Sequence, residues 1–471
     1  MSTTSLDSAP AQRLKPDAYM TLIAAVAAIA GGLYGYDTGI ISGALPLIAR
    51  EFSLDYRAQE LVAAIILLGA VIGSLACTRL SASQGRRRAI MMISALYSVG
   101  VLAAACSPNV TCLALSRFVI GLAVGGSTQV VPTYIAELAE PDKRGRLVTY
   151  FNCAIGVGIL LAAIVGGVAG EHVFTWRWMI GVALVPSLLL LAGMSRLPRS
   201  PRWLVEHDRV RDARIELAKV RHTREQVREE IADMMEIAQQ HHDEGGAHGW
   251  RALAQPWVRP ALIAGLGVAA FTQLTGIEMM IYYTPTFLRD AGFGDSASLW
   301  AALGVALTYL TMTLLGKFSI DHLGRRALSL ATLPFAAASL FVLGAVLHFH
   351  LAGHAQQWWV VACLIVFMVF NSGGIQVIGW LTGAEIYPLP IRDKAAGAHS
   401  AMLWGSNLIL TGTALSMTRL LGVGGAMWVY GSLNVLAWIF IFFVMPETRG
   451  RSLEDIERAL RDGSFTPRAS A

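Results

Sequence analysis

Apolar stretches of about 20 residues or more recur along the whole chain, and short polar segments separate them. As α-helices, stretches of this length can cross a bilayer core of roughly 30 Å. The twelve expected spans are 19–47, 58–80, 89–107, 111–133, 147–170, 175–196, 258–289, 298–320, 327–349, 357–386, 394–420 and 424–445. The pattern therefore predicts an all-α polytopic membrane protein with two six-helix bundles.

The polar segments divide the chain into five regions. We expect a disordered cytosolic N-terminus at 1–18, a bundle at 19–198, cytosolic linker helices at 199–256, a second bundle at 257–446 and a cytosolic tail with a short helix at 447–471. Arg13 and Lys15 precede the first apolar run, as basic residues do in a signal peptide. This run contains Asp37 and has no cleavage site, so we interpret it as a retained span.

Charge gives the expected orientation. Only 15% of the residues are charged, whereas soluble domains carry about 25%. The net charge of +5 comes from Lys and Arg in short loops, so it does not indicate a nucleic-acid partner. These loops hold Arg79, Arg86, Arg87, Arg88, Lys143, Arg144, Arg146, Arg325, Arg326, Arg392 and Lys394. We expect the protein in the inner (plasma) membrane of the cell. Because loops rich in Lys and Arg stay on the cytosolic side, we expect both termini in the cytosol.

The two halves repeat one another. GRRRAIMM (85–92) corresponds to GRRALSLA (324–331), and AELAEPDKRGR (136–146) to AEIYPLPIRDK (384–394). PRSPRWLVE (198–206) more faintly resembles PETRGRSLEDIE (446–457). Three correspondences in the same order indicate two parallel repeats of six helices, an arrangement found in transporters.

The stretch FTQLTGIEMMIYYTPTF (271–287) concentrates polar groups inside an apolar run. Gly276 interrupts it and Pro285 follows near its end. Polar side chains at mid-depth on an interrupted membrane helix are typical of a substrate pathway. We therefore expect a transporter, with this helix as one wall of its substrate site.

Asp37 lies well inside the first span, where a carboxylate is costly unless it faces a cavity or a partner. We expect Arg117, near the start of the fourth span, to be that partner. If the exposure of Asp37 to Arg117 alternates, the carboxylate can load and release a proton. The alternative is a static ion pair that fixes two helices.

Matched charges at the cytosolic helix ends predict a gate. Acidic residues accompany the basic ones at corresponding places in both halves, which orientation alone does not require. The expected network comprises Arg86, Glu137, Arg144, Arg146, Asp321, Arg325, Glu385 and Arg392. The alternative is that these charges only set the topology, because single surface pairs are weak.

No metal, nucleotide or nucleophile–base pattern occurs, so we predict no enzyme activity, no metal and no cofactor, with a proton as the coupling ion. The five cysteines fall mostly in apolar segments and are expected to be unpaired, with a Cys106–Cys112 disulfide as the alternative. The expected partners are a small-molecule substrate, the proton and the lipid bilayer, for a monomer.

Nine motifs together identify a family resemblance over about residues 19–460. They are GYDTGIISGAL (35–45), GRRRA (85–89), SRFVIGLAVGG (116–126), YIAELAEPDKRG (134–145), PRSPRWL (198–204), QLTGIEMMIYYTPTF (273–287), DHLGRR (321–326), EIYPLPIR (385–392) and PETRGRSLEDIE (446–457). The chain resembles the sugar porters of the major facilitator superfamily. The resemblance implies the major facilitator fold, alternating access, and a hexose, pentose or polyol in a central cavity. It also implies that Asp37 and Arg117 match the proton-coupling pair of bacterial proton–sugar symporters.

Carried over position by position, the resemblance implies eight sugar-contacting residues. They are Tyr34, Asn152, Thr272, Gln273, Glu278, Tyr282, Trp380 and Trp404. Amides and hydroxyls would pair with sugar hydroxyls, and the aromatic faces would stack on the ring.

The chain departs from the family pattern at several of these places. Asn152 and Thr272 stand where Gln is usual, Tyr309 where Asn is usual, and the span-ten pattern Gly-Pro-Val-Pro-Trp is replaced at 376–380 by Gln-Val-Ile-Gly-Trp. In the loops, Ala82 and Ser83 replace Asp and Arg, and Arg199 replaces Glu. Several pocket positions have changed together, which argues against an ordinary aldohexose as the substrate. The missing loop carboxylate should weaken the gate network of the first half.

Glu278, in place of the usual Asn, is the sharpest departure. Ionised, it can accept hydrogen bonds from vicinal hydroxyls or pair with a cationic substrate. Protonated, it can donate to the ligand or carry a second proton; the alternative is that Glu278 only contacts a neighbouring helix and takes no part in transport.

We predict a proton-coupled symporter that imports a monosaccharide or polyol. The alternatives are a major-facilitator carrier of a non-sugar polar metabolite and an uncoupled sugar facilitator.

Overall fold

The computed structural model describes residues 16–140, 143–168, 175–243, 249–290, 292–351, 356–388, 391–451 and 453–467. Some side chains within these ranges, those of Arg144 and Asp321 among them, lie outside the described part. Most of the expected N-terminal lead, residues 1–15, also lies outside it. The first helix begins at Pro16, three residues before the expected start of the first span.

Both halves of the described chain are built from α-helices. The first half contains α1 (Pro16–Phe52), α2 (Tyr56–Gln84), α3 (Arg86–Ala105), α4 (Val110–Leu138), α5 (Arg144–Val168), α6 (Trp176–Gly181) and α7 (Leu184–Met194). The second half contains α11 (Arg259–Leu274), α12 (Ile277–Asp290), α13 (Asp295–Leu323), α14 (Arg325–His348), α15 (Gln356–Ser372), α16 (Ile375–Glu385) and α17 (Arg392–Val444). Between the halves lie α8 (Pro201–Glu206), α9 (Val210–Leu217), α10 (Arg224–Asp243) and the 3₁₀ turns η2 (Gly249–Ala254) and η3 (Pro256–Val258), and α18 (Leu453–Arg461) follows the second half.

Eleven segments of the described chain are long and apolar enough to cross a membrane. The last of them lies in α17, whose 53 residues would extend about 80 Å as one helix, more than twice the thickness of a bilayer core. Gly422 interrupts this helix with φ 73°, a conformation open to glycine and costly for most other residues. Two crossings by α17 would bring the count to the predicted twelve.

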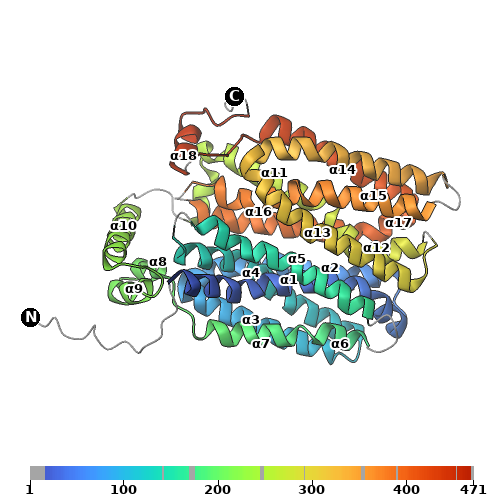
Figure 1. Ribbon diagram of the computed structural model, residues 1–471, viewed down its shortest axis with the longest axis horizontal. Helices are drawn as coiled ribbons and strands as arrows, with labels where there is room; N and C mark the ends of the chain where they lie inside the picture. Colours follow the sequence, from blue (N-terminus) through green and yellow to red (C-terminus); the bar gives the residue numbers. More distant parts are fainter. Residues whose placement is uncertain are drawn as a thin grey trace, which may run out of the picture.

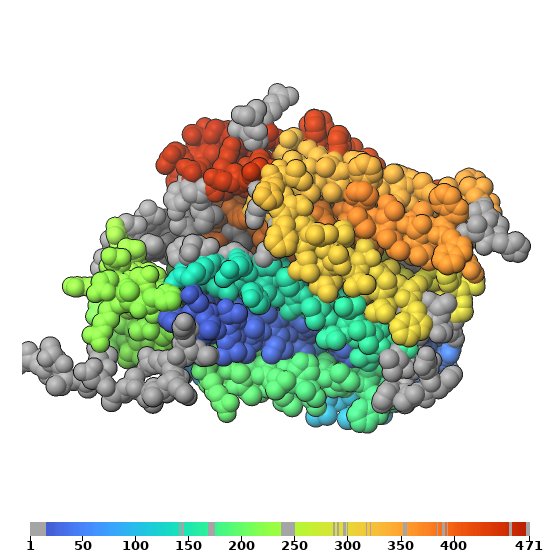
Figure 2. All heavy atoms as spheres, in the orientation of Figure 1, coloured from blue at the N-terminus to red at the C-terminus, as the bar shows by residue number. Residues whose placement is uncertain are grey.

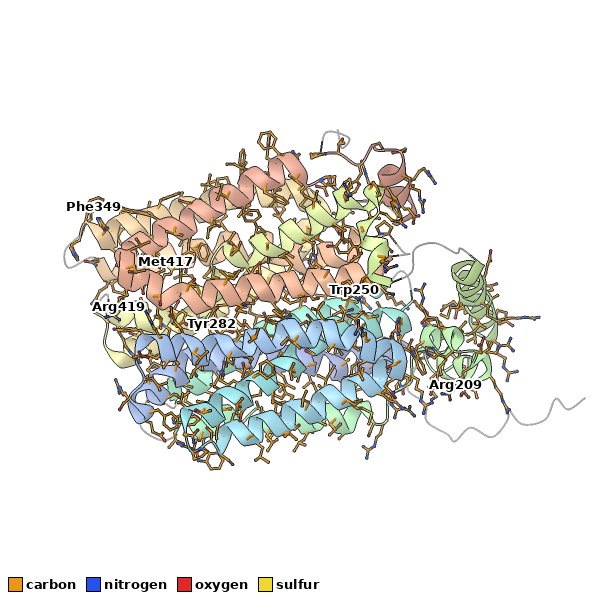
Figure 3. The ribbon with its side chains drawn as sticks, turned by 180° about the vertical axis from the view of Figure 1, so that it is seen from behind. Arg209, Trp250, Tyr282, Phe349, Met417 and Arg419 are labelled. Atoms are coloured by element: carbon orange, nitrogen blue, oxygen red, sulfur yellow. The ribbon has the colours of Figure 1, made fainter. Side chains whose placement is uncertain are left out.

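The two halves lie side by side along their length (Figure 1). Helices α8, α9 and α10 project from one end of the molecule, and α18 lies toward the same end. We call this the linker end. Figure 3 shows Arg209 at the linker end and Arg419 and Phe349 at the opposite end. In Figure 2 the second half, in yellow and orange, packs directly against α5, in green-blue, through α13.

Glycines allow the helices of the first half to approach very closely. α1 packs against α5, and α2 against α4. A Cβ on Gly35 would lie 1.9 Å from the carbonyl oxygen of Ile155, and one on Gly125 would lie 2.0 Å from that of Ala70. Such distances exclude any side chain, so these glycines are packing residues, as small residues are at membrane helix interfaces.

At the linker end, each half contains an equivalent set of hydrogen bonds around one glutamate. The Ser200 hydroxyl donates to Glu137 Oε2, and Glu137 pairs with Arg86. In the second half the Thr448 hydroxyl donates to Glu385 Oε2, and Glu385 pairs with Arg325. The faint similarity of the segments at 198–206 and 446–457 therefore reflects equivalent positions in the structure. Ser200 corresponds to Thr448, Glu137 to Glu385, and Arg86 to Arg325.

Candidate functional site

The stretch 271–287 is a broken helix. α11 ends at Leu274 and α12 begins at Ile277, with Gly276 between them at φ 98°. The side-chain amide of Asn434 on α17 donates to the carbonyl oxygen of Thr275 at 2.9 Å, which satisfies a backbone group that the break leaves unpaired. A hydrogen bond from a distant helix thus stabilises the break between α11 and α12. Beyond the break, α12 packs against α1 and carries its polar side chains there.

Glu278 and Tyr34 connect the two halves within the site. The Tyr34 hydroxyl on α1 donates to Glu278 Oε1 on α12 at 3.1 Å, and both side chains are buried. Glu278 Oε2 has no hydrogen-bond partner. A buried carboxylate oxygen without a partner is expensive, so the carboxylate is open to a further donor.

Two tryptophan rings from two further helices lie close to the Tyr34 ring. The ring centroid of Tyr34 lies 5.0 Å from that of Trp404 on α17 and 6.2 Å from that of Trp380 on α16. The two tryptophans are 6.5 Å apart. Trp404 Nε1 donates to the Thr128 hydroxyl on α4 at 3.2 Å, which fixes the indole between the halves. Tyr34, Trp380, Trp404 and Glu278 therefore form one cluster, which we call the aromatic–carboxylate cluster.

A small polar cavity adjoins this cluster. It has a volume of about 30 Å³ and lies between α5, α13 and α16. Asn152, Tyr309, Gln376 and Trp380 line it. A cavity of this size holds only about two water molecules, so the helices must separate before a sugar can enter. The site is closed in this conformation.

Thr272 and Gln273 occupy the last turn of α11 and are fully buried. The Thr272 hydroxyl donates to the carbonyl oxygen of Val268 in its own helix. A Cβ on Gly379 of α16 would lie 2.2 Å from that hydroxyl, so the two helices touch there. Both amide atoms of Gln273 lack hydrogen-bond partners. Gln273 therefore has free hydrogen-bonding capacity in this conformation, whereas the Thr272 hydroxyl donates within its own helix.

Tyr282 lies one turn further along α12, and Figure 3 places it in the interior of the molecule. It is buried, and its ring centroid is 6.3 Å from that of Tyr283. All eight residues expected to contact a sugar therefore lie on helices that meet near the middle of the bundle. Six of them are buried, and the other two, Asn152 and Trp380, line the small cavity.

Asp37 and Arg117 approach one another without forming a hydrogen bond. Arg117 Nη2 lies 3.8 Å from Asp37 Oδ2, within ion-pair range but beyond hydrogen-bonding distance. Arg117 Nε instead donates to the carbonyl oxygen of Val62 at 2.7 Å, and its two Nη atoms have no hydrogen-bond partner. Both side chains are buried. Charge attracts the pair, but protonation of Asp37 would break no hydrogen bond between them.

The expected gate residues form pairs within each half. Arg86 Nη2 lies 2.9 Å from Glu137 Oε1 and joins α3 to α4. Arg325 binds both oxygens of Glu385 at 2.8 and 3.0 Å and joins α14 to α16. Arg146 is exposed and Arg392 is half-buried, while the side chains of Arg144 and Asp321 lie outside the described part. The two described acid–base pairs therefore brace each bundle at the linker end.

Two buried ionisable residues of the spans, Glu60 and His399, are not among the predicted site residues. Glu60 on α2 accepts hydrogen bonds from the backbone and hydroxyl of Ser416 on α17. His399 lies between the carbonyl oxygen of Gly379, at 2.9 Å, and the Tyr387 hydroxyl, at 3.1 Å. In each case the available signal was an ionisable residue inside an apolar stretch. None of the five cysteines takes part in a disulfide, so the alternative Cys106–Cys112 bridge is not formed.

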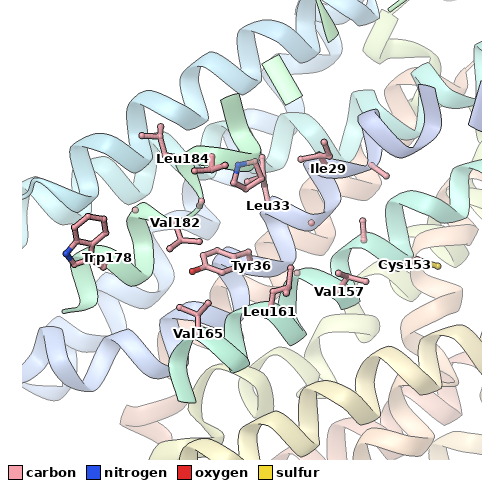
Figure 4. A pocket seen from close by; sticks show the side chains of 18 of the residues that line it. Ile29, Leu33, Tyr36, Cys153, Val157, Leu161, Val165, Trp178, Val182 and Leu184 are labelled. Atoms are coloured by element: carbon pink, nitrogen blue, oxygen red, sulfur yellow. The ribbon is translucent and has the colours of Figure 1, made fainter. Parts of the chain in front are cut away.

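A wide groove of about 1140 Å³ lies elsewhere, on the outer face of the first half (Figure 4). α1, α5, α6 and α7 form its walls, which are almost entirely apolar, and Trp178 and Val182 stand at its rim. It contains none of the eight expected substrate residues. Its position and apolar lining suit lipid chains, and the polar site between the halves is the better place for a sugar.

Comparison with known proteins agrees with this arrangement. A family model described as "Sugar (and other) transporter" matches residues 23–460. The protein described as "Putative metabolite transport protein YwtG" of Bacillus subtilis is 40% identical over 92% of this chain and 94% of its own length. The galactose-proton symporter of Escherichia coli K12 is 34% identical over 93% of this chain and 94% of its own length. The myo-inositol transporter IolT of Bacillus subtilis is 33% identical, with 94% of both chains covered.

The fold has solved counterparts as well. The structure of the proton:xylose symporter XylE bound to 6-bromo-6-deoxy-D-glucose superposes with a TM-score of 0.81, at 24% identity, over 95% of this chain and all of the other. Helices in two repeated bundles around a buried polar site define a membrane transporter of the major facilitator class. The chain belongs to the sugar transporter family of that superfamily.

Proposed function

We propose that the protein is a proton-coupled symporter that imports a monosaccharide or polyol by alternating access. The observation that carries the proposal is the buried pair of Asp37 and Arg117, 3.8 Å apart and not joined by a hydrogen bond. Such a carboxylate can gain a proton when it faces one side of the membrane and lose it when it faces the other. Relatives named as a galactose-proton symporter and a myo-inositol transporter support a sugar or polyol as cargo.

The eight polar and aromatic residues between the bundles would bind the substrate. Asn152 beside the small cavity and the unpartnered amide of Gln273 have hydrogen-bonding capacity for sugar hydroxyls. Trp380 and Trp404 supply faces for the apolar side of the ring. Because the Tyr34–Glu278 hydrogen bond joins the two bundles, it must loosen when the site opens.

The linker end would face the cytosol, with both termini on that side of the inner membrane. The arginine-rich starts of α3 and α14 support this orientation, because basic loops stay inside. The pairs Arg86–Glu137 and Arg325–Glu385 would keep each bundle rigid at the cytosolic gate while the bundles rock about the central site.

Uptake into proteoliposomes tests the coupling. The purified full-length protein is reconstituted, and accumulation of labelled galactose, xylose and myo-inositol is measured with and without an inward proton gradient. We expect accumulation above equilibrium only with the gradient, and abolition by a protonophore. Equilibration to the same level with and without the gradient would instead identify an uncoupled facilitator.

A further inference from the structure

Glu278 is a buried carboxylate without a cation. It is 2% exposed, and no ion pair in the described part of the chain includes it. Its one hydrogen bond is from the neutral Tyr34 hydroxyl, and Oε2 accepts none. An ion buried without a partner costs several kcal/mol, so this site gains stability from any positive group that reaches it.

The buried arginine of the first half, Arg117, already faces another carboxylate. Arg117 is directed to Asp37 and Val62. Lys and Arg elsewhere in the described chain lie largely at the helix ends and in the linker. In the described part of the chain, no side chain therefore supplies the counter-charge for Glu278.

The rings beside Glu278 have the composition of an ammonium-binding site. Tyr34, Trp380 and Trp404 stand within 6.5 Å of one another, centroid to centroid. Aromatic faces attract a cation within about 6 Å of their centroid, most strongly once water is excluded. Tyr34 connects both features, since its ring packs on Trp404 and its hydroxyl binds Glu278. A cation bound to Glu278 would therefore lie next to aromatic faces.

The other side of the site is neutral and polar. Asn152, Tyr309 and Gln376 line the small cavity that Trp380 shares with the aromatic–carboxylate cluster. Amides and hydroxyls of this kind suit uncharged sugar hydroxyls. One substrate that satisfies both sides has a hydroxylated ring and a single positive group.

We propose that the preferred substrate is an amino sugar, a monosaccharide that carries a protonated primary amine, and that Glu278 pairs with its ammonium group. This inference rests on the proposed function, because it assumes that the central site transports a sugar. Glu278 is then the residue that selects the charged sugar over its neutral counterpart, and the three rings shield the ion pair from water.

The test compares three sugars and three proteins in proteoliposomes. The sugars are glucosamine, glucose and N-acetylglucosamine, which differ in the presence of the ammonium group. The proteins are the parent, Glu278→Gln and Glu60→Gln. Glu60→Gln is the matched control, since it neutralises a buried carboxylate that lies on α2 and binds Ser416 instead. Thermal unfolding in detergent first verifies that each variant is folded.

We expect the parent to take up glucosamine with a KM about tenfold or more below that for glucose. Glu278→Gln should raise the KM for glucosamine about tenfold or more, as expected for loss of a hydrogen bond to a charged group. The KM for glucose should stay the same or fall in this variant. Glu60→Gln should leave the ratio of the two KM values unchanged.

Proton-dependent uptake of neutral sugars with no preference for glucosamine would overturn the inference and leave the proposed function in place. An equal loss of glucosamine and glucose uptake in Glu278→Gln would also overturn it, because the carboxylate would then serve as a proton carrier or a structural group. If neither charged nor neutral sugars bind or enter, as judged by uptake and by ligand-induced stabilisation, the proposed function itself fails.

Discussion

Glu60 on α2 holds Ser416 on α17 through both oxygens of its carboxylate. Oε1 accepts from the backbone N–H at 2.6 Å, and Oε2 accepts from the hydroxyl at 2.5 Å. The contact joins the two halves near the end opposite the linker, where Figure 3 places Met417 and Arg419. Because hydrogen bonds to a carboxylate are among the stronger ones, this pair favours the state in which that end is closed.

Glu60→Ala should therefore let the bundles separate at that end. Hydrogen bonds to a charged group contribute about 1.5–3 kcal/mol each, enough to change a two-state population strongly. Spin labels on cysteines introduced at the exposed positions Arg57 and Leu420, with the native cysteines replaced, report the distance between α2 and α17. We expect a new population at longer distance. An unchanged distance distribution would show that the pair does not hold the end closed.

Asp37→Asn should separate substrate movement from proton movement. The amide keeps the size of the side chain but cannot exchange a proton, so uphill accumulation should be lost while exchange of labelled for unlabelled substrate persists. Counterflow and gradient-driven uptake, measured on the same vesicles, distinguish the two. Glu51→Gln, which removes a partly exposed carboxylate that pairs with Arg177 at the end of α1, is the control and should keep gradient-driven uptake.

Gly35→Ala should disrupt the contact of α1 with α5. The added methyl group would lie 1.9 Å from the carbonyl oxygen of Ile155, so the helices must move apart. We expect a lower midpoint of thermal unfolding and loss of uptake. Gly32→Ala is the matched control on the same helix, because its Cβ would meet the carbonyl oxygen of Ala154 at an ordinary 3.6 Å. Similar behaviour of the two variants would refute the close-contact explanation.

Glu447 caps α14, and Arg199 stands at the corresponding position of the first half. Its carboxylate accepts from the backbone N–H groups of Arg325 and Arg326 at 2.9 and 3.0 Å. Arg199 precedes Ser200, as Glu447 precedes Thr448, and it lines a small hollow with Gly85 and Arg86 at the start of α3. The first half thus has a positive side chain where the second half has a negative one.

Arg199→Glu should therefore stabilise the protein. A carboxylate near a helix N-terminus contributes about 0.3–1 kcal/mol when exposed, and the neighbouring arginines add attraction. We expect a higher midpoint of thermal unfolding, measured in detergent, and a smaller gain at high salt. Glu447→Arg in the second half should lower the midpoint. If Arg199→Glu lowers it as well, the two positions are not equivalent.

The sequence by itself determined the class of fold and most of the helices. Repeated apolar stretches can be stable in a bilayer only as helices, so length and hydropathy were sufficient. The breaks within the spans were less evident. Gly276 signalled the interruption between α11 and α12, but nothing local indicated that the side-chain amide of Asn434 on α17 would donate to the carbonyl oxygen of Thr275 there.

The sequence also identified polar residues of the site, because ionisable and polar residues stand out inside apolar spans. Asp37 and Glu278 were identified in this way. Only the tertiary structure decided their partners: Arg117 at 3.8 Å for one, and Tyr34 on the far side of the bundle interface for the other. The physical reason is that periodicity and hydropathy describe each helix separately, whereas hydrogen bonds, ring contacts and an uncompensated charge depend on which helices pack together.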